Sequence, residues 1–336
     1  MLRYLVLSFV CILLWSCAAT APNYNKINGV SFVASRDQVT QEHIEPVVNV
    51  NADHAAVMPF GFIRDIESPE LLYNTNRQWF GETRAGAKQY IEMLHQNNIQ
   101  VMLKPQIWIR HGQFTGHLTM KTEEGWQQLE KSYEGFILEF AQLAQDSNVA
   151  MFCIGTELNA FVAARPQFWN TLIKDVRRIY KGELTYAENW DTFSNVPFWK
   201  ELDYIGIDAY FPLSDEETPT LKTLTKAWQP HKEEIMKLYK SIKKPILFTE
   251  YGYRSTHFTA KEPWDSNHEI TDVNLAGQTN ALQALYDEFW QEDWFAGGFI
   301  WKWFHAHDRV GGNGNSQFTP QNKPAEILVR KTYSKL

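Results

Sequence analysis

Eight apolar runs rich in β-forming residues alternate along the chain with stretches of helical periodicity, and this alternation limits the folds open to it. The runs are, in chain order, INGVSFVAS, HAAVMPFGF, IQVMLKPQIWI, VAMFCIGTEL, ELTYAENW, DYIGIDAYF, KPILFTEYGY and AGGFIWKWF. The stretches between them include RAGAKQYIEMLHQNN, GWQQLEKSYEGFILEFAQLAQ, PQFWNTLIKDVRRIYKG and NLAGQTNALQALYDEFWQ. Apolar residues at three- and four-residue spacing give each stretch one face that can cover a sheet. This alternation is typical of parallel βα units in α/β proteins.

Eight such units in 336 residues predict a single-domain (β/α)8 barrel over residues 28–336, with only a short helix, around FWKEL, between the fifth and sixth strands. An open, doubly wound sheet is the alternative, but no Gly-rich phosphate loop follows the first run. Barrel enzymes place their chemistry at the C-terminal ends of the strands. The polar and aromatic residues at the expected strand ends are Lys104, Trp108, Glu157, Asn189, Trp190, Asp208, Tyr210, Glu250, Trp301 and Trp303. This pattern favours an active site.

Composition narrows the classes of partner. The chain has 13 Trp and 14 Tyr, more than core packing alone usually needs, and surplus aromatic rings suit stacking on sugars. The formal net charge is −7 and no Lys/Arg-rich run is present, so a nucleic-acid partner is not expected. The oligomeric state is left open.

The first residues, MLRYLVLSFVCILLWSC, have the features of an export signal. A single basic residue precedes an apolar segment that is too short for a permanent membrane-spanning helix. Ser16-Cys17 resembles a bacterial lipobox, although Trp15 is unusual there. We therefore expect a lipoprotein-type signal peptide at 1–16, lipidation of Cys17, a short tether at 17–27 and an exported, membrane-anchored protein. Ordinary cleavage to a soluble secreted protein is the alternative.

Cysteine and histidine usage gives no sign of a metal or cofactor. Cys11 lies in the expected signal and Cys17 is the expected lipidation site, so only Cys153 remains in the folded part. No intramolecular disulfide or cysteine metal site is then possible, and we expect Cys153 to act as a small buried apolar residue. His305 and His307 have a His-x-His spacing, but we interpret them as part of a polar loop.

Two glutamates carry the strongest chemical signal. Glu157 ends the fourth run and Glu250 the seventh, 250 − 157 = 93 residues later. In a closed barrel the ends of strands four and seven face each other across the opening. Retaining glycoside hydrolysis requires two carboxyl groups about 5–5.5 Å apart, one a nucleophile and one a general acid/base. The alternative is that Glu157 and Glu250 are only salt-bridged, for example to Lys104 and Arg254.

Neighbouring strand ends supply supporting groups. We expect Tyr210 to hydrogen-bond Glu250, and Trp301 to form a floor on which a pyranose ring stacks. Asn189 and Lys104 are candidate donors to sugar hydroxyls, and Trp190 is a further candidate for substrate binding.

As a set, the motifs FCIGTEL, LTYAENWD, FWKELDYIGIDAYFPL, LFTEYGYRS and GGFIWKWF resemble glycoside hydrolase family 113, a family of β-mannanases in clan A. The resemblance runs from about Asn28 to Leu336. It implies a (β/α)8 barrel, retaining hydrolysis by double displacement without a cofactor, and a β-1,4-linked mannan or manno-oligosaccharide substrate. By motif it makes Glu157 the acid/base and Glu250 the nucleophile. The positions that match the sugar site are Lys104, Asn189, Asp208, Tyr210 and Trp301.

Two positions depart from the expected pattern. Thr156 stands where most of clan A has the asparagine that bonds the sugar 2-hydroxyl, and Gln106 stands where a histidine is expected. A different β-glycan, exo action or transglycosylation is the alternative within the enzyme class. A surface glycan-binding lipoprotein without catalysis is the alternative from another class, but such a protein has no need of both glutamates.

Overall fold

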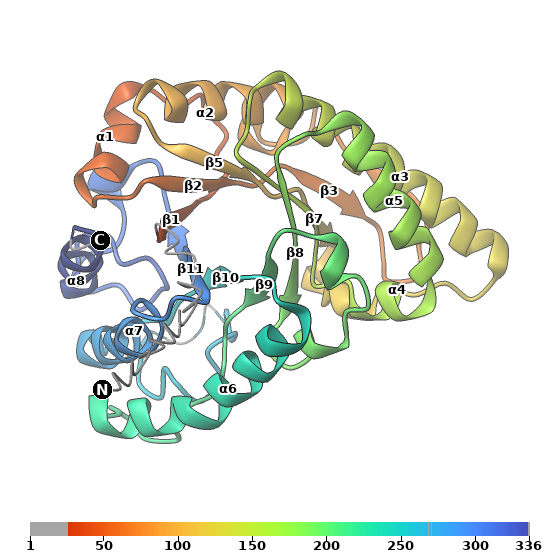
Figure 1. Cartoon of the computed structure of the whole chain (residues 1–336). Helices are drawn as coiled ribbons and strands as arrows, with labels where there is room; N and C mark the ends of the chain where they lie inside the picture. The colour runs from red at the N-terminus through yellow and green to blue at the C-terminus, as the bar shows by residue number, and fades with distance from the viewer. Residues whose placement is uncertain (1–25, 268, 270, 335–336) are drawn as a thin grey trace, which may run out of the picture.

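The computed structural model describes residues 26–267, 269 and 271–334. Within this part of the chain, eight parallel strands close into a barrel, confirming the predicted (β/α)8 fold (Figure 1). In order around the barrel they are β1 (Ile27–Phe32), β2 (His54–Val57), β5 (Gln100–Leu103), β7 (Met151–Thr156), β8 (Glu183–Asn189), β9 (Ile205–Asp208), β10 (Ile246–Tyr251) and β11 (Phe295–Trp303). Each strand lies in one of the predicted runs, except that β11 begins one residue before its run, and β11 pairs with β1 to close the sheet.

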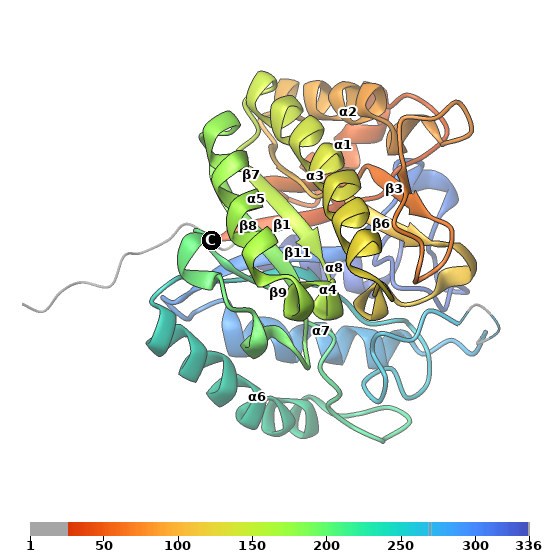
Figure 2. The same cartoon turned by 90° about the vertical axis from the view of Figure 1, so that its right-hand side faces the viewer.

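Helices surround the barrel (Figure 1). The longer ones are α1 (Gln41–Asn49), α2 (Arg84–Gln96), α3 (Glu123–Asp146), α5 (Pro166–Ile179), α6 (Leu221–Ile242), α7 (Leu275–Phe289) and α8 (Pro324–Tyr333). The four quoted amphipathic stretches form α2, α3, α5 and α7, and FWKEL contains the single 3-10 turn Trp199–Glu201. Figures 1 and 2 show α3 beside α5 and α6 beside α7.

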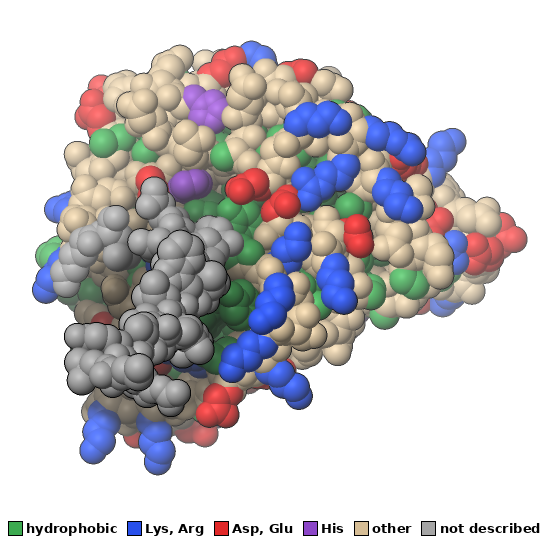
Figure 3. Space-filling model, in the orientation of Figure 1, with side chains coloured by type: hydrophobic (Ala, Val, Ile, Leu, Met, Phe, Trp, Pro, Cys, Tyr) green, Lys and Arg blue, Asp and Glu red, His purple; other side chains and the backbone are tan. Residues whose placement is uncertain are grey.

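Side-chain caps explain where several helices begin. Thr83, Thr122, Thr220 and Asn274 each accept a hydrogen bond from a backbone N–H in the first turn of α2, α3, α6 and α7 respectively. Each cap satisfies one of the N–H groups that a helix start leaves without an internal partner. The outer helix faces are solvated, and on the face drawn in Figure 3 basic and acidic side chains are interspersed.

A small second sheet was not predicted. The second and third runs each break into two strands. The outer piece of the second run, β3 (Phe60–Ile63), pairs with β6 (Gln106–Ile109) of the third run on one side and with β4 (Leu71–Leu72) on the other, in a three-stranded sheet. Pro59 and Pro105 lie at the two breaks. Proline has no N–H to donate to a ladder, so each run leaves the barrel at its proline.

The barrel interior is filled by side chains. One buried cluster inside it consists of Ile27, Ala56, Met102, Met151, Cys153, Ala187, Tyr204, Leu247, Ala296 and Phe299. A Cβ added to Gly29 would lie 2.3 Å from the Phe299 ring, so this glycine leaves room for the ring that fills the interior. Cys153 is fully buried and free, which confirms its predicted apolar role.

The N-terminal predictions lie mostly outside the described residues. These are the signal peptide at 1–16, the lipidated Cys17 and most of the tether at 17–27. Strand β1 begins at Ile27, so the last residue of the predicted tether already belongs to the barrel. Among the described residues, no helix is long and apolar enough to cross a membrane.

Candidate active site

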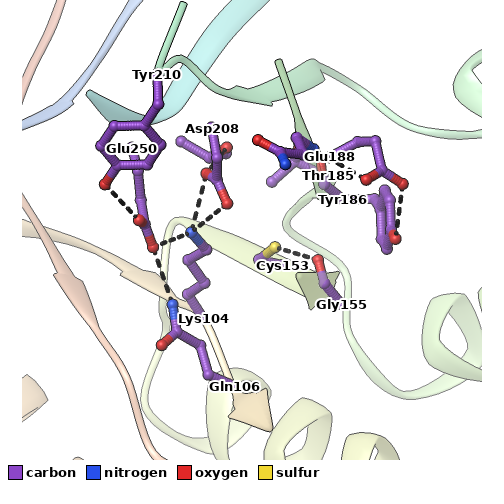
Figure 4. Close-up of polar contacts among 12 residues, drawn as sticks. Lys104, Gln106, Cys153, Gly155, Thr185, Tyr186, Glu188, Asp208, Tyr210 and Glu250 are labelled. Carbon is purple, nitrogen blue, oxygen red and sulfur yellow. Dashed lines mark hydrogen bonds and ion pairs between the residues drawn. The ribbon is translucent and has the colours of Figure 1, made fainter. Parts of the chain in front are cut away.

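Glu250, the residue before the last one of β10, has both carboxylate oxygens hydrogen-bonded (Figure 4). Oε1 accepts from Lys104 Nζ at 2.7 Å and from Gln106 Nε2 at 3.0 Å. Oε2 accepts from the Tyr210 hydroxyl at 2.8 Å, as the sequence predicts. Lys104 directly follows β5, Gln106 begins β6 of the small sheet, and Tyr210 lies two residues after β9. The three hydrogen bonds, one of them from an ammonium group, fix the direction of both carboxylate oxygens.

Lys104 and Asp208 form a buried support beneath Glu250. Lys104 is fully buried, and its Nζ also lies 3.2 Å and 3.4 Å from the two carboxylate oxygens of Asp208. Thr249 donates to Asp208 Oδ1 at 2.8 Å. Burial by itself would lower the pKa of Lys104, but the charges of Asp208 and Glu250 outweigh it and leave that pKa above its usual value. Burial raises the pKa of Asp208 to about 7 despite the nearby Lys104.

The structure does not present Lys104 as an open donor to sugar hydroxyls. Its side chain has no exposed surface, and its ammonium is already shared between Asp208 and Glu250. Asp208 is only 1% exposed and is likewise turned to Lys104 rather than to open space. Lys104 contacts both carboxylates, so the pair of Lys104 and Asp208 helps to fix the position of Glu250.

Glu157 has a different environment. It directly follows β7, is half-buried, and has a φ of 51°, a left-handed conformation that costs a residue other than glycine about 1–3 kcal/mol. Its N–H donates to Ala187 O at 2.8 Å. Among the described residues no hydrogen bond or ion pair is found for its carboxyl group. Burial, followed by the negative charges of Asp208 and Glu250, raises the pKa of Glu157 well above its usual range.

The two glutamates thus differ as an acid and a nucleophile must. Glu250 is held by three donors, whereas Glu157 is unbonded and favours its protonated form. They are also close enough for the charge of Glu250 to act on Glu157.

The predicted sugar-binding residues lie around this pair at strand ends. Asn189 Oδ1 accepts from Trp190 N at 2.9 Å, which leaves the side-chain N–H groups of Asn189 without a partner in the described part of the chain. The Trp190 ring stacks on Trp264, with centroids 5.3 Å apart and planes at 16°. Trp301, at the end of β11, is half-buried, so part of its ring remains accessible.

The small sheet adds an aromatic face beside the site. Phe60 pairs with Gln106 and Phe62 with Trp108 in parallel register, so the four side chains share one face of the sheet. Gln106 on that face reaches Glu250, and Trp108 is 50% exposed. We call Phe60, Phe62 and Trp108 the aromatic platform. Its first residue, Phe60, is paired with Gln106, which hydrogen-bonds Glu250.

Several site residues escaped sequence reasoning. Trp264 has no motif around it that indicates a site, and its stacking partner Trp190 is 74 positions away (264 − 190 = 74). Lys302 lies between two tryptophans in β11, its Nζ 5.4 Å from the Trp301 ring centroid. Burial lowers the pKa of Lys302, partly offset by the charge of Glu250. The motif GFIWKWF contains this lysine, and its position after Trp301 was the one available signal.

The histidines of the last strand end do not gather with other ligands. His307 Nε2 lies 3.0 Å from a Glu326 oxygen, and the His305 ring packs edge-on against His43. In residues 26–267, 269 and 271–334 no group of three or more His, Cys, Asp or Glu side chains could hold a metal ion.

Solved structures of known proteins align with this chain. A β-1,4-mannanase of glycoside hydrolase family 113, solved as a complex, aligns at a TM-score of 0.80 and 22% identity over 93% of this chain and 99% of its own. The family 113 β-mannanase AaManA from Alicyclobacillus acidocaldarius, in complex with ManMIm, aligns at 0.80 and 22% identity over 94% and 99%. A β-glucuronidase from Ruminococcus gnavus reaches 0.59 at 13% identity, covering 88% of this chain and 46% of its own.

No curated protein sequence matches the chain. The sequence profile of Glycoside Hydrolase Family 113, however, matches residues 33–323, which is most of its length. The chain therefore belongs to glycoside hydrolase family 113 and is a glycoside hydrolase.

Proposed function

We propose that this glycoside hydrolase cleaves β-1,4-mannosidic linkages in mannan or manno-oligosaccharides with retention of configuration. The observation that carries the assignment of a general acid and a nucleophile is the contrast between the two glutamates, and retention is what the resemblance to family 113 implies. Glu250 has three donors on its carboxylate, while Glu157 has a free carboxyl group with a raised pKa. The mannan substrate is supported by the family and by the mannanases among its structural neighbours.

The reaction follows from these environments. In the first step Glu250 attacks the anomeric carbon while Glu157 donates its proton to the departing glycosidic oxygen. A covalent glycosyl–Glu250 intermediate results. In the second step the ionised Glu157 takes a proton from water, which attacks the same carbon and releases Glu250. Lys104, Gln106 and Tyr210 hold the nucleophile aimed throughout, and no cofactor takes part.

Product analysis tests the substrate. The purified protein is incubated with β-1,4-mannan, glucomannan, xylan and cellulose oligosaccharides, with Glu250→Gln as the blank, and products are identified by mass spectrometry. Manno-oligosaccharides from the parent alone support the proposal, and their lengths distinguish endo from exo action. Cleavage of another glycan only would keep the mechanism and overturn the substrate. Binding without turnover on every glycan would favour a glycan-binding lipoprotein instead.

Proton NMR of the first product tests the mechanism. A β-anomer released before mutarotation is expected for two displacements, whereas an α-anomer would require a single displacement and contradict the proposal. In Glu157→Ala, added azide should attack the glycosyl–enzyme intermediate and give a β-glycosyl azide. Azide is already an anion, so its attack needs no general base.

We also propose that the protein is exported and carried on a lipid attached to Cys17. The support is the lipobox-like Ser16-Cys17 after a short apolar segment. In a bacterial host, the parent should fractionate with membranes and Cys17→Ala should not. Equal partitioning of the two proteins would contradict lipid anchoring.

A further inference from the structure

Behind the candidate acid/base, strand β8 carries a buried carboxylate that the mechanism above does not use. Glu188 is 1% exposed and, within the described residues, has no Lys or Arg partner. Its neighbour on the same face is Tyr186, whose ring packs against Trp169 of α5 and against Phe198, with centroids 5.4 Å away in both cases. The pair therefore faces the helix layer and not the barrel interior. A buried carboxylate is costly unless its hydrogen bonds are satisfied, so its partners matter.

Both carboxylate oxygens of Glu188 accept hydrogen bonds, and two of the three donors belong to Tyr186 and Asn189 on the same strand. Its Oε2 accepts from the Tyr186 hydroxyl at 3.2 Å (Figure 4). Its Oε1 accepts from Asn189 N at 2.9 Å and from Thr192 Oγ1 at 3.0 Å. The Tyr186 oxygen, with its own proton directed at Glu188, accepts from Leu158 N at 2.8 Å.

These bonds fix the backbone on both sides of Glu157. Glu157 N donates to Ala187 O at 2.8 Å, and the next amide, Leu158 N, donates to Tyr186. Between these two anchored amides Glu157 adopts its left-handed φ of 51°. Such a conformation persists only where the surroundings hold it from several sides. The direction of the Glu157 side chain depends on that φ, since Cβ moves with it.

The glycine two residues before Glu157 makes the arrangement possible. A Cβ on Gly155 would lie 2.9 Å from Cε2 of Tyr186 and 2.7 Å from the Tyr133 hydroxyl. Without a side chain at this position the Tyr186 ring can cross β7 and bring its hydroxyl to Leu158. The sequence IGTEL thus contains Glu157, which is to be held in place, and Gly155, which leaves room for the Tyr186 ring.

We propose that Tyr186 and Glu188 are positioning residues for the general acid/base Glu157, with Glu188 also holding the backbone of Asn189. The inference rests on the proposed retaining mechanism. Tyr186 holds the peptide after Glu157 in place, and Glu188 orients the Tyr186 hydroxyl so that its oxygen faces Leu158 N–H. Neither side chain touches substrate.

The test is Tyr186→Phe, which removes the acceptor for Leu158 N and leaves the ring. Tyr180→Phe is the matched control, because Tyr180 is also buried and its hydroxyl donates to a backbone oxygen, Val149 O at 2.7 Å, near the opposite end of β7. Both variants are assayed on two β-manno-oligosaccharide substrates. One has a sugar leaving group, which needs a proton, and the other a dinitrophenolate leaving group, which does not.

Tyr186→Phe should lower kcat/KM for the sugar leaving group by roughly 10-fold or more, a part of the 10²–10⁴ that general acid catalysis contributes. For the dinitrophenyl substrate it should match Tyr180→Phe within about 3-fold, because glycosylation then needs no acid. An equal loss on both substrates, or the same pattern in Tyr180→Phe, would overturn the inference. Glu188→Gln, which keeps the shape of the side chain, should show the same selective loss to a smaller degree than Glu188→Ala.

Hydrogen exchange gives a readout that does not depend on turnover. The Leu158 amide should exchange at least about 10-fold faster in Tyr186→Phe than in the parent and in Tyr180→Phe, because it alone loses its acceptor. Unchanged protection would overturn the positioning role even on an active enzyme. The parent could be inactive on both substrates while the Leu158 amide still exchanges faster in Tyr186→Phe alone. That result would count against the proposed function but would support the hydrogen bond that holds Leu158.

Discussion

Lys104 Nζ lies 2.7 Å from Glu250 Oε1 and 3.2 Å from Asp208 Oδ1, so one buried ammonium joins two carboxylates at the centre of the barrel. Lys104 comes from the end of β5, Asp208 from β9 and Glu250 from β10. Because the three side chains are almost fully buried, their charges compensate one another where water cannot. The position of Glu250 is therefore tied to the charge balance of the barrel interior.

Replacing Lys104 by methionine should destabilise the fold and lower turnover together. Two buried carboxylates would lose their common partner, which costs about 3–5 kcal/mol in the free energy of unfolding. The control is Lys121→Ala, whose partner Glu67 and own ammonium are exposed, with an expected cost of about 0–1 kcal/mol. Urea denaturation measures both.

The double variant Lys104→Met/Asp208→Asn separates stability from catalysis. Removing the second charge should restore part of the lost stability, while activity stays low because Glu250 still lacks its lysine donor. A single Lys104→Met variant as stable as the parent would show that the carboxylates do not depend on Lys104.

Replacing Glu250 by glutamine should abolish turnover and preserve binding. The amide is nearly isosteric and keeps an oxygen that can accept from Lys104 or Gln106, but it cannot attack the anomeric carbon. We expect a loss in kcat on the order of 10⁴–10⁶-fold, with the Kd for an oligosaccharide within about 10-fold of the parent by calorimetry, since the binding surface is unchanged. Substantial residual turnover would exclude Glu250 as the nucleophile.

The barrel and the glutamate pair could be predicted from the sequence because they depend on local pattern and on strand order. Each strand forms inside a run of β-forming residues, and closure of the barrel brings residues 157 and 250 to the same end. The bond between Tyr210 and Glu250 follows in the same way, since β9 and β10 are neighbours.

The remaining features depend on relations that strand order does not contain. The burial of Lys104 requires two carboxylates to converge on it from other strands, and the second sheet forms only because Pro59 and Pro105 release their runs at matching heights. Tyr186 and Glu188 resemble ordinary strand residues facing the helices. Their relation to Glu157 is a matter of the left-handed φ and of the space at Gly155, neither of which a periodic pattern reveals.

The rate of hydrolysis should fall at high pH as Glu157 loses its proton. Burial and the charges of Asp208 and Glu250 raise the pKa of this carboxyl group well above its usual range. The acid form therefore persists to higher pH, and kcat/KM for an oligosaccharide should decline only as pH rises through that raised pKa. A pH–rate profile measures the falling limb.

Glu157→Gln provides the control for the pH profile. Assayed on a dinitrophenyl glycoside, which needs no acid for the first step, this variant should lose the falling limb. A falling limb that persists in Glu157→Gln would have to be assigned to another group, such as Asp208, the pKa of which is raised to about 7.

The aromatic platform should matter for long substrates and not for short ones. Trp108 is half-exposed on the sheet face that Gln106 shares, and its removal leaves the core intact. Because an aromatic ring stacks on a pyranose face, Trp108→Ala should raise KM for a hexasaccharide by roughly 10-fold at nearly constant kcat, the loss of about 1 kcal/mol or slightly more in ring stacking. For the shortest oligosaccharide that is cleaved, KM should change less than about 2-fold. Ile327→Ala, an exposed apolar change on α8, is the control and should alter neither value. Equal effects of Trp108→Ala on short and long substrates would contradict this prediction. They would place the ring next to the cleaved bond instead of at a sugar subsite far from it.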